Sequence, residues 1–353
     1  MEFEEVLATK RKIVWRQIQK YLRLPPALTG KRKIPDHYRS WLAFHWQLVN
    51  NYPLRLGKYL RPTLLLLTAE AMGVEIKKAV QVAAAMQTSE DWLLIHDDIE
   101  DGSLQRRGQP ALQKLFGDAL AINAGDTLHA IMWKMLLDNQ KFVGQKKAEE
   151  INKEFYDMIM RTTFGQTVEI KWTQENCQKL TDEDLFLILD GKTSYYTIAG
   201  PMRLGAILGN ANKAQLETIY EFGQSLGRCF QIIDDLLDLT SDFKGLKKQR
   251  GNDIYEGKRT IMLMRLFREV GGEDKKKLEK IMNKKREEKT SEEIEFVICL
   301  MKKYGSLLYA EKIAQDFARE ARFLFQKKMG FLKKQPARRQ LEAAIDFILK
   351  RSY

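Results

Sequence analysis

Two short acidic stretches, each interrupting an apolar run, constrain this chain most strongly. One runs from Asp97 to Asp101 and the other from Asp234 to Asp238, and both have the pattern D-D-x-x-D. On a helix, positions four apart share one face, so the outer aspartates of each stretch point the same way, about 6 Å apart along the axis. Charged side chains are rarely buried without partners. The two stretches therefore predict one polar cavity with acidic walls on two helices.

Like charges on one helix face repel each other, so a bound cation would stabilise both stretches. Carboxylate oxygens suit Mg²⁺, which keeps several waters and is held by one or two carboxylates together with substrate phosphates. The pattern thus predicts a Mg²⁺ site for a phosphate or diphosphate ester. A solvated helix turn is the alternative, and the flanking apolar residues argue against it for the pair.

The composition indicates a folded protein, with 44% hydrophobic, 10% aromatic and 30% charged residues. No apolar run reaches the length of about 18 residues that a transmembrane helix needs. The acidic start, Met1 to Glu5, lacks the apolar segment of a signal peptide. The three cysteines have no metal-ligand spacing and are typical of reduced packing residues. These features predict a soluble, cytoplasmic protein.

The net charge of +12 could indicate nucleic acid, an acidic membrane surface or anionic substrates as partners. Much of the excess lies in the lysine-rich stretches 275–289 and 327–334, which are typical of solvated helix faces. No stripe of basic and aromatic residues occurs, so we expect no nucleic-acid partner.

Nearly the whole chain shows the three- and four-residue apolar spacing of helices. Helices are predicted over 4–22, 38–48, 60–72, 77–100, 111–137, 146–173, 182–209, 213–240, 259–270, 292–303, 306–329 and 337–351. Strand-like alternation, linkers and repeats are missing, so we expect a single all-α domain over 1–353. Residues 1–36, a helix and a basic loop with Lys31, Arg32 and Lys33, form its N-terminal extension.

A diphosphate site also needs positive side chains. Arg106 and Arg107 follow the first acidic stretch within one loop, and planar guanidinium groups bind phosphate oxygens bidentately. Lys58 and Arg61 lie three positions apart at a helix start, where backbone N–H groups also attract anions. The remaining candidates are Lys192, which precedes Thr193, and Lys258 in a glycine-punctuated loop.

Taken together, these stretches resemble the trans-isoprenyl diphosphate synthases of the polyprenyl synthetase family, in particular short-chain members such as geranylgeranyl and farnesyl diphosphate synthases. The resemblance covers about Gly57 to Lys258, with a weaker echo over Phe347 to Arg351. It rests on G-K-x-x-R-P, R-R-G, G-Q at 165–166, K-T at 192–193, F-Q-x-x-D-D, G-x-D-x-x-x-G-K and both acidic motifs. It implies the all-α isoprenoid synthase fold, a helical bundle around a central cavity, and a homodimer.

The resemblance also implies a role for each candidate residue. The metal ligands are Asp97, Asp98, Asp101, Asp234 and Asp238, of which Asp98 and Asp238 are supporting. The allylic diphosphate is held by Arg106, Lys192, Thr193, Gln231 and Lys258. Isopentenyl diphosphate is held by Lys58, Arg61 and Arg107.

These roles predict the condensation of isopentenyl diphosphate with dimethylallyl, geranyl or farnesyl diphosphate. Three Mg²⁺ ions and the lysines stabilise charge on the departing diphosphate, so the allylic C–O bond ionises to a carbocation. The double bond of isopentenyl diphosphate attacks that cation. A proton then leaves to the released diphosphate, since no side chain is an obvious general base.

Three residues just before the first motif bear on substrate and product. The family usually has His or Gln seven residues before it, lending a hydrogen bond to isopentenyl diphosphate, whereas this chain has Glu90, followed by Asp91. A carboxylate there repels a diphosphate unless it is protonated, turned aside, or paired with Lys58 or Arg61. Trp92 is expected to close the floor of the elongation cavity, with ordinary core packing as the alternative. We therefore expect a C15 to C20 product, with C20 favoured.

Other classes fit less well. A terpene cyclase shares the fold but usually carries N/D-D-x-x-S/T-x-x-x-E as its second metal motif, which Asp234 to Asp238 does not match. A metal phosphohydrolase using His96 and Asp97 would need further histidines, and the other three form no fitting motif. A catalytically weak, diphosphate-binding partner subunit of a synthase is the remaining alternative, favoured by Glu90 and opposed by the intact metal motifs.

Overall fold

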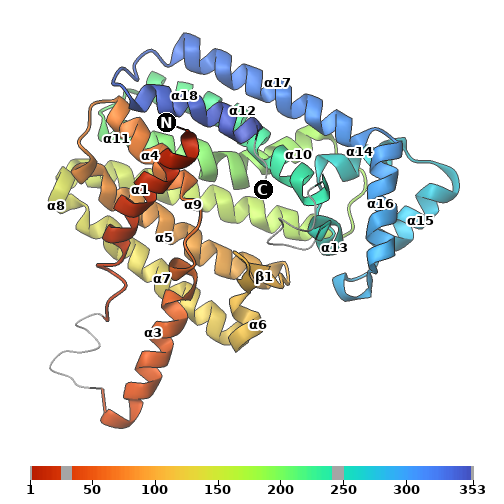
Figure 1. Ribbon diagram of the computed structural model, residues 1–353, viewed down its shortest axis with the longest axis horizontal. Coiled ribbons are helices and arrows are strands. Elements are labelled where there is room, and N and C mark those ends of the chain that lie inside the picture. The colour runs from red at the N-terminus through yellow and green to blue at the C-terminus, as the bar shows by residue number, and fades with distance from the viewer. Residues whose placement is uncertain (1, 25–33, 241–249, 351–353) are drawn as a thin grey trace. The chain divides into compact units, whose positions relative to one another are not determined.

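The computed structural model describes residues 2–24, 34–240 and 250–350, and they are almost entirely helical (Figure 1). The strands in this part of the chain are two short ones, β1 (Gln105–Arg106) and β2 (Gln109–Pro110), paired antiparallel with Gln105 opposite Pro110. The all-α prediction is confirmed. No described helix is long and apolar enough to span a membrane. The basic loop residues Lys31 to Lys33, and Arg351, lie outside the described residues.

The chain divides into two compact units. Unit 1 consists of Met1–Glu154, Pro201–Ala211 and Leu332–Leu341. Unit 2 consists of Phe155–Gly200, Asn212–Phe331 and Glu342–Tyr353. Each acidic stretch belongs to a different unit. A single domain over 1–353 stays a prediction.

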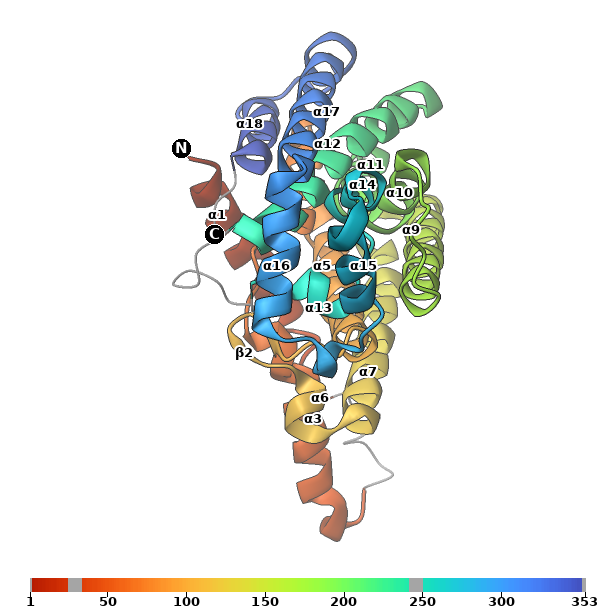
Figure 2. The ribbon, with the colours of Figure 1, turned by 90° about the vertical axis from the view of Figure 1, so that its right-hand side faces the viewer.

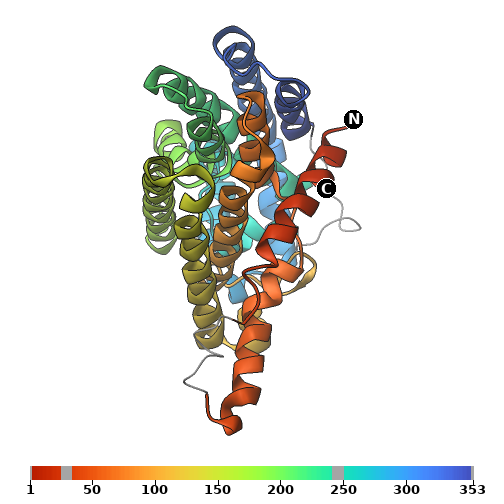
Figure 3. The ribbon, with the colours of Figure 1, turned by 90° about the vertical axis from the view of Figure 1, so that its left-hand side faces the viewer.

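Unit 1 is organised around α5 (Ile76–Glu100), which packs against α1 (Phe3–Ile18), α4 (Leu60–Ala71) and α7 (Asp118–Asp138). Figure 3 shows the red α1 running beside this group of helices. Small residues make the close packing possible, since Ala83, Ala84 and Ala85 of α5 are fully buried. The other elements here are η1 (Asp36–Tyr38), α3 (Arg39–Leu54), α6 (Leu112–Phe116) and α8 (Gln140–Val143).

A C-terminal cap that contains a glycine ends α5 directly after its acidic stretch. Gly102 has φ +63°, its N–H donates to Ile99 O at 3.2 Å, and the N–H of Ser103 donates to Asp98 O at 2.9 Å. This pair of hydrogen bonds is the Schellman motif, in which a glycine takes the left-handed position. The chain therefore turns directly from α5 into the loop that carries Arg106 and Arg107.

Unit 2 is organised around α12 (Lys213–Thr240), which packs against η2 (Leu189–Ala199) and α17 (Ser306–Lys328). Figure 2 shows α12 and α17 side by side. Its other helices are α10 (Asp182–Ile188), α13 (Asn252–Glu256), α14 (Ile261–Glu269), α15 (Gly272–Met282), η3 (Arg286–Glu288) and α16 (Ser291–Lys303). The helices α9 (Gln145–Gln174), α11 (Gly200–Leu208) and α18 (Ala337–Leu349) contribute residues to both units.

Two glycines let α12 and η2 approach closely. A Cβ added at Gly223 would lie 2.4 Å from the Cβ of Ala199, and one at Gly227 would lie 2.3 Å from the Cα of Ser194. Real atoms do not come this close without steric overlap, so only glycine fits at either position. This contact fixes the position of the acidic face of α12 relative to Lys192 and Thr193 on η2.

Two of the predicted helices are divided in the structure. The predicted helix 182–209 consists of α10, the π-helix η2 and α11. π-turns are rare and occur mostly at functional sites, and this one carries Lys192 and Thr193. The predicted helix 111–137 breaks between α6 and α7 at Gly117, whose φ is +83°. A single glycine in an apolar pattern does not by itself predict such a break, since helices tolerate glycine at a cost.

Candidate functional site

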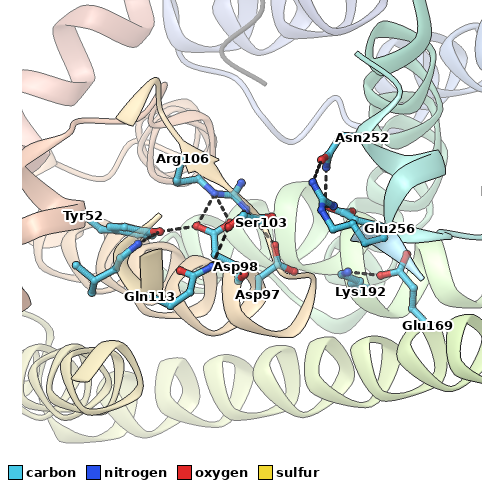
Figure 4. Close-up of polar contacts among 12 residues, drawn as sticks. Tyr52, Asp97, Asp98, Ser103, Arg106, Gln113, Glu169, Lys192, Asn252 and Glu256 are labelled. Carbon is cyan, nitrogen blue, oxygen red and sulfur yellow. Dashed lines mark hydrogen bonds and ion pairs between the residues drawn. The ribbon is translucent and has the colours of Figure 1, made fainter. Parts of the chain in front are cut away.

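In the first acidic stretch the central feature is a fully buried aspartate, Asp98, with 0% of its side chain exposed. Nε of Arg106 donates to its two carboxylate oxygens at 2.9 and 3.0 Å, and the Tyr52 hydroxyl donates to Oδ2. The Gln113 amide donates to the backbone carbonyl of Asp98 at 2.6 Å (Figure 4). Asp98 thus ties α3, α5 and the loop after α5 together.

Electrostatics favour the charged form of Arg106 and the protonated form of Tyr52. Burial alone would lower the pKa of Arg106, but the neighbouring carboxylates of Asp98 and Asp97 outweigh it and raise the pKa. Burial, and then the charge of Asp98, raise the pKa of Tyr52. Arg106 is therefore always a cation, and Tyr52 is always a donor.

The outer aspartates of the same stretch are in a different environment. The side chain of Asp97 is 26% exposed and its Oδ2 lies 3.3 Å from NH2 of Arg106. Asp101, four residues later, is also partly exposed. The predicted carboxylate face of α5 is therefore present, while both oxygens of the predicted ligand Asp98 already accept hydrogen bonds from protein groups. This arrangement favours a supporting position for Asp98.

The predicted homoallylic residues lie beside two carboxylates. NH1 of Arg61 is 3.3 Å from Oε1 of Glu90, and NH2 of Arg107 is 2.9 Å from Oδ1 of Asp91. The pairing of Glu90 with Arg61, one of the partners predicted for it, is confirmed. Gly57 makes room for this arrangement, because a Cβ there would lie 2.9 Å from NH2 of Arg107. Lys58 is exposed and precedes the start of α4.

Burial raises the pKa of Asp91 to about 6, against the opposing attraction of Arg107. A carboxylate loses its hydration when buried, so its protonated form is favoured. The carboxylate of Asp91 is 1% exposed, whereas that of Glu90 is 14% exposed.

Trp92 lies in an aromatic cluster between α5 and α7. Its ring centroid is 5.5 Å from that of His96 and 4.7 Å from that of His129, and Nε1 of Trp133 donates to Nε2 of His129 at 2.8 Å. Trp92 is buried, with 7% exposure. Its role as a chain-length floor stays a prediction.

The second acidic stretch repeats the arrangement with a lysine. Nζ of Lys258 donates to Oδ1 of Asp235 at 2.8 Å, and Gln231 Nε2 donates to the same oxygen at 2.7 Å. Thr193 Oγ1 in turn donates to Oε1 of Gln231 at 3.1 Å. Three residues predicted to hold the allylic diphosphate, Thr193, Gln231 and Lys258, thus share one hydrogen-bonded chain in unit 2.

Two carboxylates lie near this one lysine, because Asp253 Oδ2 is also 3.6 Å from Nζ of Lys258. Burial raises the pKa of Asp235 to about 7. Burial alone would lower the pKa of Lys258, but the charges of Asp235, Asp253 and Glu169 raise it well above its usual value. Lys258 is therefore charged at neutral pH.

Asp238 and Lys192 complete the second site. Oδ2 of Asp238 accepts a hydrogen bond from the backbone N–H of Asp253 at 3.0 Å, which anchors the loop that carries Lys258. Lys192 is ion-paired with Glu169 (Figure 4). Gly165 permits this, because a Cβ there would lie 2.9 Å from the backbone nitrogen of Lys192.

In the part of the chain that the structure describes, no three His, Cys, Asp or Glu side chains gather closely enough to hold a metal ion by themselves. Mg²⁺ does not need such a cage, since one or two carboxylates with substrate phosphates and water suffice. The partly exposed outer aspartates, Asp97, Asp101, Asp234 and Asp238, have the oxygen ligands that this ion prefers.

Sequence reasoning missed several residues of these networks, among them Asp235, Tyr52 and Glu169. Asp235 could have been found, because it is the second residue of its motif, as Asp98 is of the other. Tyr52 and Glu169 carry no local signal, since each depends on a contact between helices distant in sequence.

The chain is similar to known proteins over most of its length. The family model for polyprenyl synthetases matches residues 46–301. A short chain isoprenyl diphosphate synthase of Methanothermobacter thermautotrophicus is 32% identical over 297 residues, covering 84% of this chain and 87% of that protein. A geranylgeranyl diphosphate synthase of Methanosarcina mazei is 32% identical over 299 residues, with 84% and 86% covered.

Solved structures are similar over nearly the whole chain. Geranylgeranyl pyrophosphate synthetase from Pyrococcus horikoshii has a TM-score of 0.83 and 27% identity, with 99% of both chains covered. A polyprenyl synthase from Caulobacter crescentus, complexed with calcium and isoprenyl diphosphate, has a TM-score of 0.81 and 23% identity, with 99% and 98% covered. The second likeness concerns the fold alone.

Proposed function

The chain belongs to the polyprenyl synthetase family and is a prenyltransferase, and we propose that it condenses isopentenyl diphosphate with an allylic diphosphate to give a short all-trans prenyl diphosphate. The observation that carries this proposal is that both acidic motifs have the same arrangement. In each, the inner aspartate is buried against a cation, and the outer aspartates are partly exposed. A solvated helix turn would not bury one carboxylate and anchor it in this way.

Metal dependence is a property of this family, and Mg²⁺ is the metal we propose. Asp97, Asp101 and Asp234 would be the main ligands, with Asp98 and Asp238 supporting. Three bound Mg²⁺ ions would supply positive charge that stabilises the departing diphosphate.

The basic residues of the chain perform the remaining steps. Lys192 and Lys258 are held by Glu169 and Asp235, so their ammonium groups are already ordered before substrate binds. Preorganised cations stabilise developing negative charge without a further ordering cost. We propose that these two lysines, with Arg106, Thr193 and Gln231, hold the allylic diphosphate as its C–O bond breaks. Lys58, Arg61 and Arg107 would hold isopentenyl diphosphate.

For the product we propose C20. The relatives reported above are named short-chain isoprenyl and geranylgeranyl diphosphate synthases. Trp92, buried against His96 and His129, would stop chain growth at that length.

We also propose a homodimer. Tyr156, Met160 and Phe164 are spaced by four residues on one face of α9 and are 53%, 51% and 65% exposed. Large apolar side chains gathered on one exposed helix face are typical of a surface that another chain covers.

The test is a product-length assay with purified protein, Mg²⁺, labelled isopentenyl diphosphate and, in turn, the C5, C10 and C15 allylic diphosphates. We expect a C20 product, loss of incorporation with a chelator, and recovery on adding Mg²⁺. Folded protein that incorporates nothing with any starter would overturn the proposal and favour a diphosphate-binding subunit.

A further inference from the structure

Glu90 occupies a place that bears on which substrate the enzyme binds well. Its Oε1 lies 3.3 Å from NH1 of Arg61 and 3.8 Å from NH2 of Arg107. Its other oxygen, Oε2, has no hydrogen-bond partner among the described residues. Oε1 of Glu90 is therefore shared between two guanidinium groups.

Asp91, the next residue, has a different part in the cluster. It is almost completely buried, and its Oδ1 is 2.9 Å from NH2 of Arg107. NH1 of the same arginine donates to the backbone carbonyl of Tyr52 at 2.9 Å. Arg107 is thus fixed from two sides, and Gly57 leaves the space that its guanidinium fills. Asp91 positions Arg107, and the more exposed Glu90 is not needed to do so.

The charges can be counted. Arg61 and Arg107 bring two positive charges to this cluster, and Glu90 and Asp91 bring two negative ones, so the charges of these four side chains cancel. A diphosphate carries several negative charges and gains affinity from each unpaired cation. Opposite charges at 3 to 4 Å near a protein surface attract strongly, and like charges repel equally.

We propose that Glu90 is a built-in competitor of isopentenyl diphosphate: it neutralises Arg61 and Arg107 in the substrate-free protein, and the incoming diphosphate has to displace it. Glu90 is therefore a specificity-determining residue that lowers affinity for the homoallylic substrate and leaves affinity for the allylic substrate unchanged. This inference rests on the proposed function, because it takes isopentenyl diphosphate as the ligand of these arginines.

The test compares wild-type protein with Glu90→Gln, which keeps the size of the side chain and removes its charge. Glu75→Gln is the matched control, since the side chain of Glu75 lies just before the same helix, is 63% exposed and pairs with Lys77. Affinity for isopentenyl diphosphate is measured by calorimetry without an allylic substrate, and the KM of each substrate is measured separately.

We expect Glu90→Gln to bind isopentenyl diphosphate about tenfold more tightly and to lower its KM by a similar factor, while the KM of the allylic substrate stays unchanged. Glu75→Gln should match the wild type. Unchanged or weaker binding by Glu90→Gln would overturn the inference, as would an equal shift in both KM values. The proposed function fails separately: a wild-type protein that forms no product, with tighter binding by Glu90→Gln, refutes the condensation and supports the competitor.

Discussion

The two acidic sites use the same pattern with different cations. On α5 the carboxylate of the inner aspartate, Asp98, accepts three hydrogen bonds from the guanidinium of Arg106. It also accepts one from the hydroxyl of Tyr52. On α12 the inner aspartate, Asp235, binds an ammonium group that a second carboxylate, Asp253, also attracts. The first site is therefore held by a planar guanidinium group that is permanently charged, and the second by the compact ammonium group of Lys258, which two carboxylates attract.

The difference indicates how each site can respond to substrate. Nε and NH2 of Arg106 already donate to Asp98, so we expect the guanidinium to move little when a diphosphate binds. Lys258 has three N–H donors and uses one of them on Asp235, so another can reach a diphosphate while the ammonium group stays in place. Variants that remove corresponding groups from the two sites test this contrast.

The largest effect should come from the outer aspartates. Asp97→Ala and Asp234→Ala each remove a proposed metal ligand, so turnover should fall by about 10²- to 10³-fold or more while the protein stays folded. Circular dichroism checks the fold and a radiolabel assay the rate. The exposed residues Asp36 and Asp316 supply matched alanine controls. Near-normal activity in either site variant would remove that site from the mechanism.

The next effect concerns stability. Arg106→Ala leaves Asp98 buried with a single hydroxyl donor, so the free energy of unfolding should fall by about 3–5 kcal/mol. Lys258→Ala should cost less, about 1–3 kcal/mol, because Gln231 still donates to Asp235 and burial has already raised the pKa of that carboxyl to about 7.

Urea denaturation of both variants at neutral pH measures this difference. Surface variants Arg39→Ala and Lys77→Ala, whose ion pairs are well exposed, should change stability by less than about 1 kcal/mol. Equal losses for Arg106→Ala and Lys258→Ala would show that the two cations are equivalent.

A smaller effect should depend on pH. Six residues before each motif, α5 has buried Asp91 and α12 has Arg228. Because burial raises the pKa of Asp91 to about 6, the folded state holds this proton to higher pH than the unfolded chain, and stability falls as pH rises from about 4 to 6. Asp91→Asn lacks this dependence.

Between pH 4.5 and 7.5, the free energy of unfolding of the wild type should fall by about 2 kcal/mol relative to that of Asp91→Asn. Denaturation curves at several pH values give this difference directly, and Asp36→Asn serves as the control. Parallel pH profiles for wild type and Asp91→Asn would contradict the raised pKa.

The smallest expected effect is a change in the chain length of the product, caused by Trp92→Ala. Five residues before each motif lie Trp92 on α5 and Cys229 on α12, both buried. Removing the indole that contacts His96 and His129 should lengthen the product by at least one C5 unit. Cys229→Ala should leave the length unchanged, and chromatography of the products compares the two. An unchanged product from an active Trp92→Ala enzyme would make Trp92 a packing residue.

The features that could be predicted from the sequence are those set by residues close to one another in the chain. The helices α5 and α12 follow from apolar spacing, and the sequence predicts Arg106 near the first motif because only four residues lie between it and Asp101. The need to neutralise Glu90 gave pairing with Arg61 as one of several alternatives, and the structure shows this pair, with Arg61 on α4. The contacts of Tyr52 with Asp98 and of Glu169 with Lys192 depend on packing between distant helices. The π-helix depends on one extra residue per turn, which leaves no mark in an apolar pattern.

The glycine contact between α12 and η2 has a consequence for how this protein tolerates mutation. Gly223 and Gly227 touch no predicted substrate group, yet any side chain there would push η2 away from α12 and carry Lys192 and Thr193 with it. The lack of a side chain at Gly223 and Gly227 therefore determines how far Lys192 on η2 lies from the aspartates of α12. Inactive natural variants are therefore expected at these two positions as readily as among the aspartates themselves.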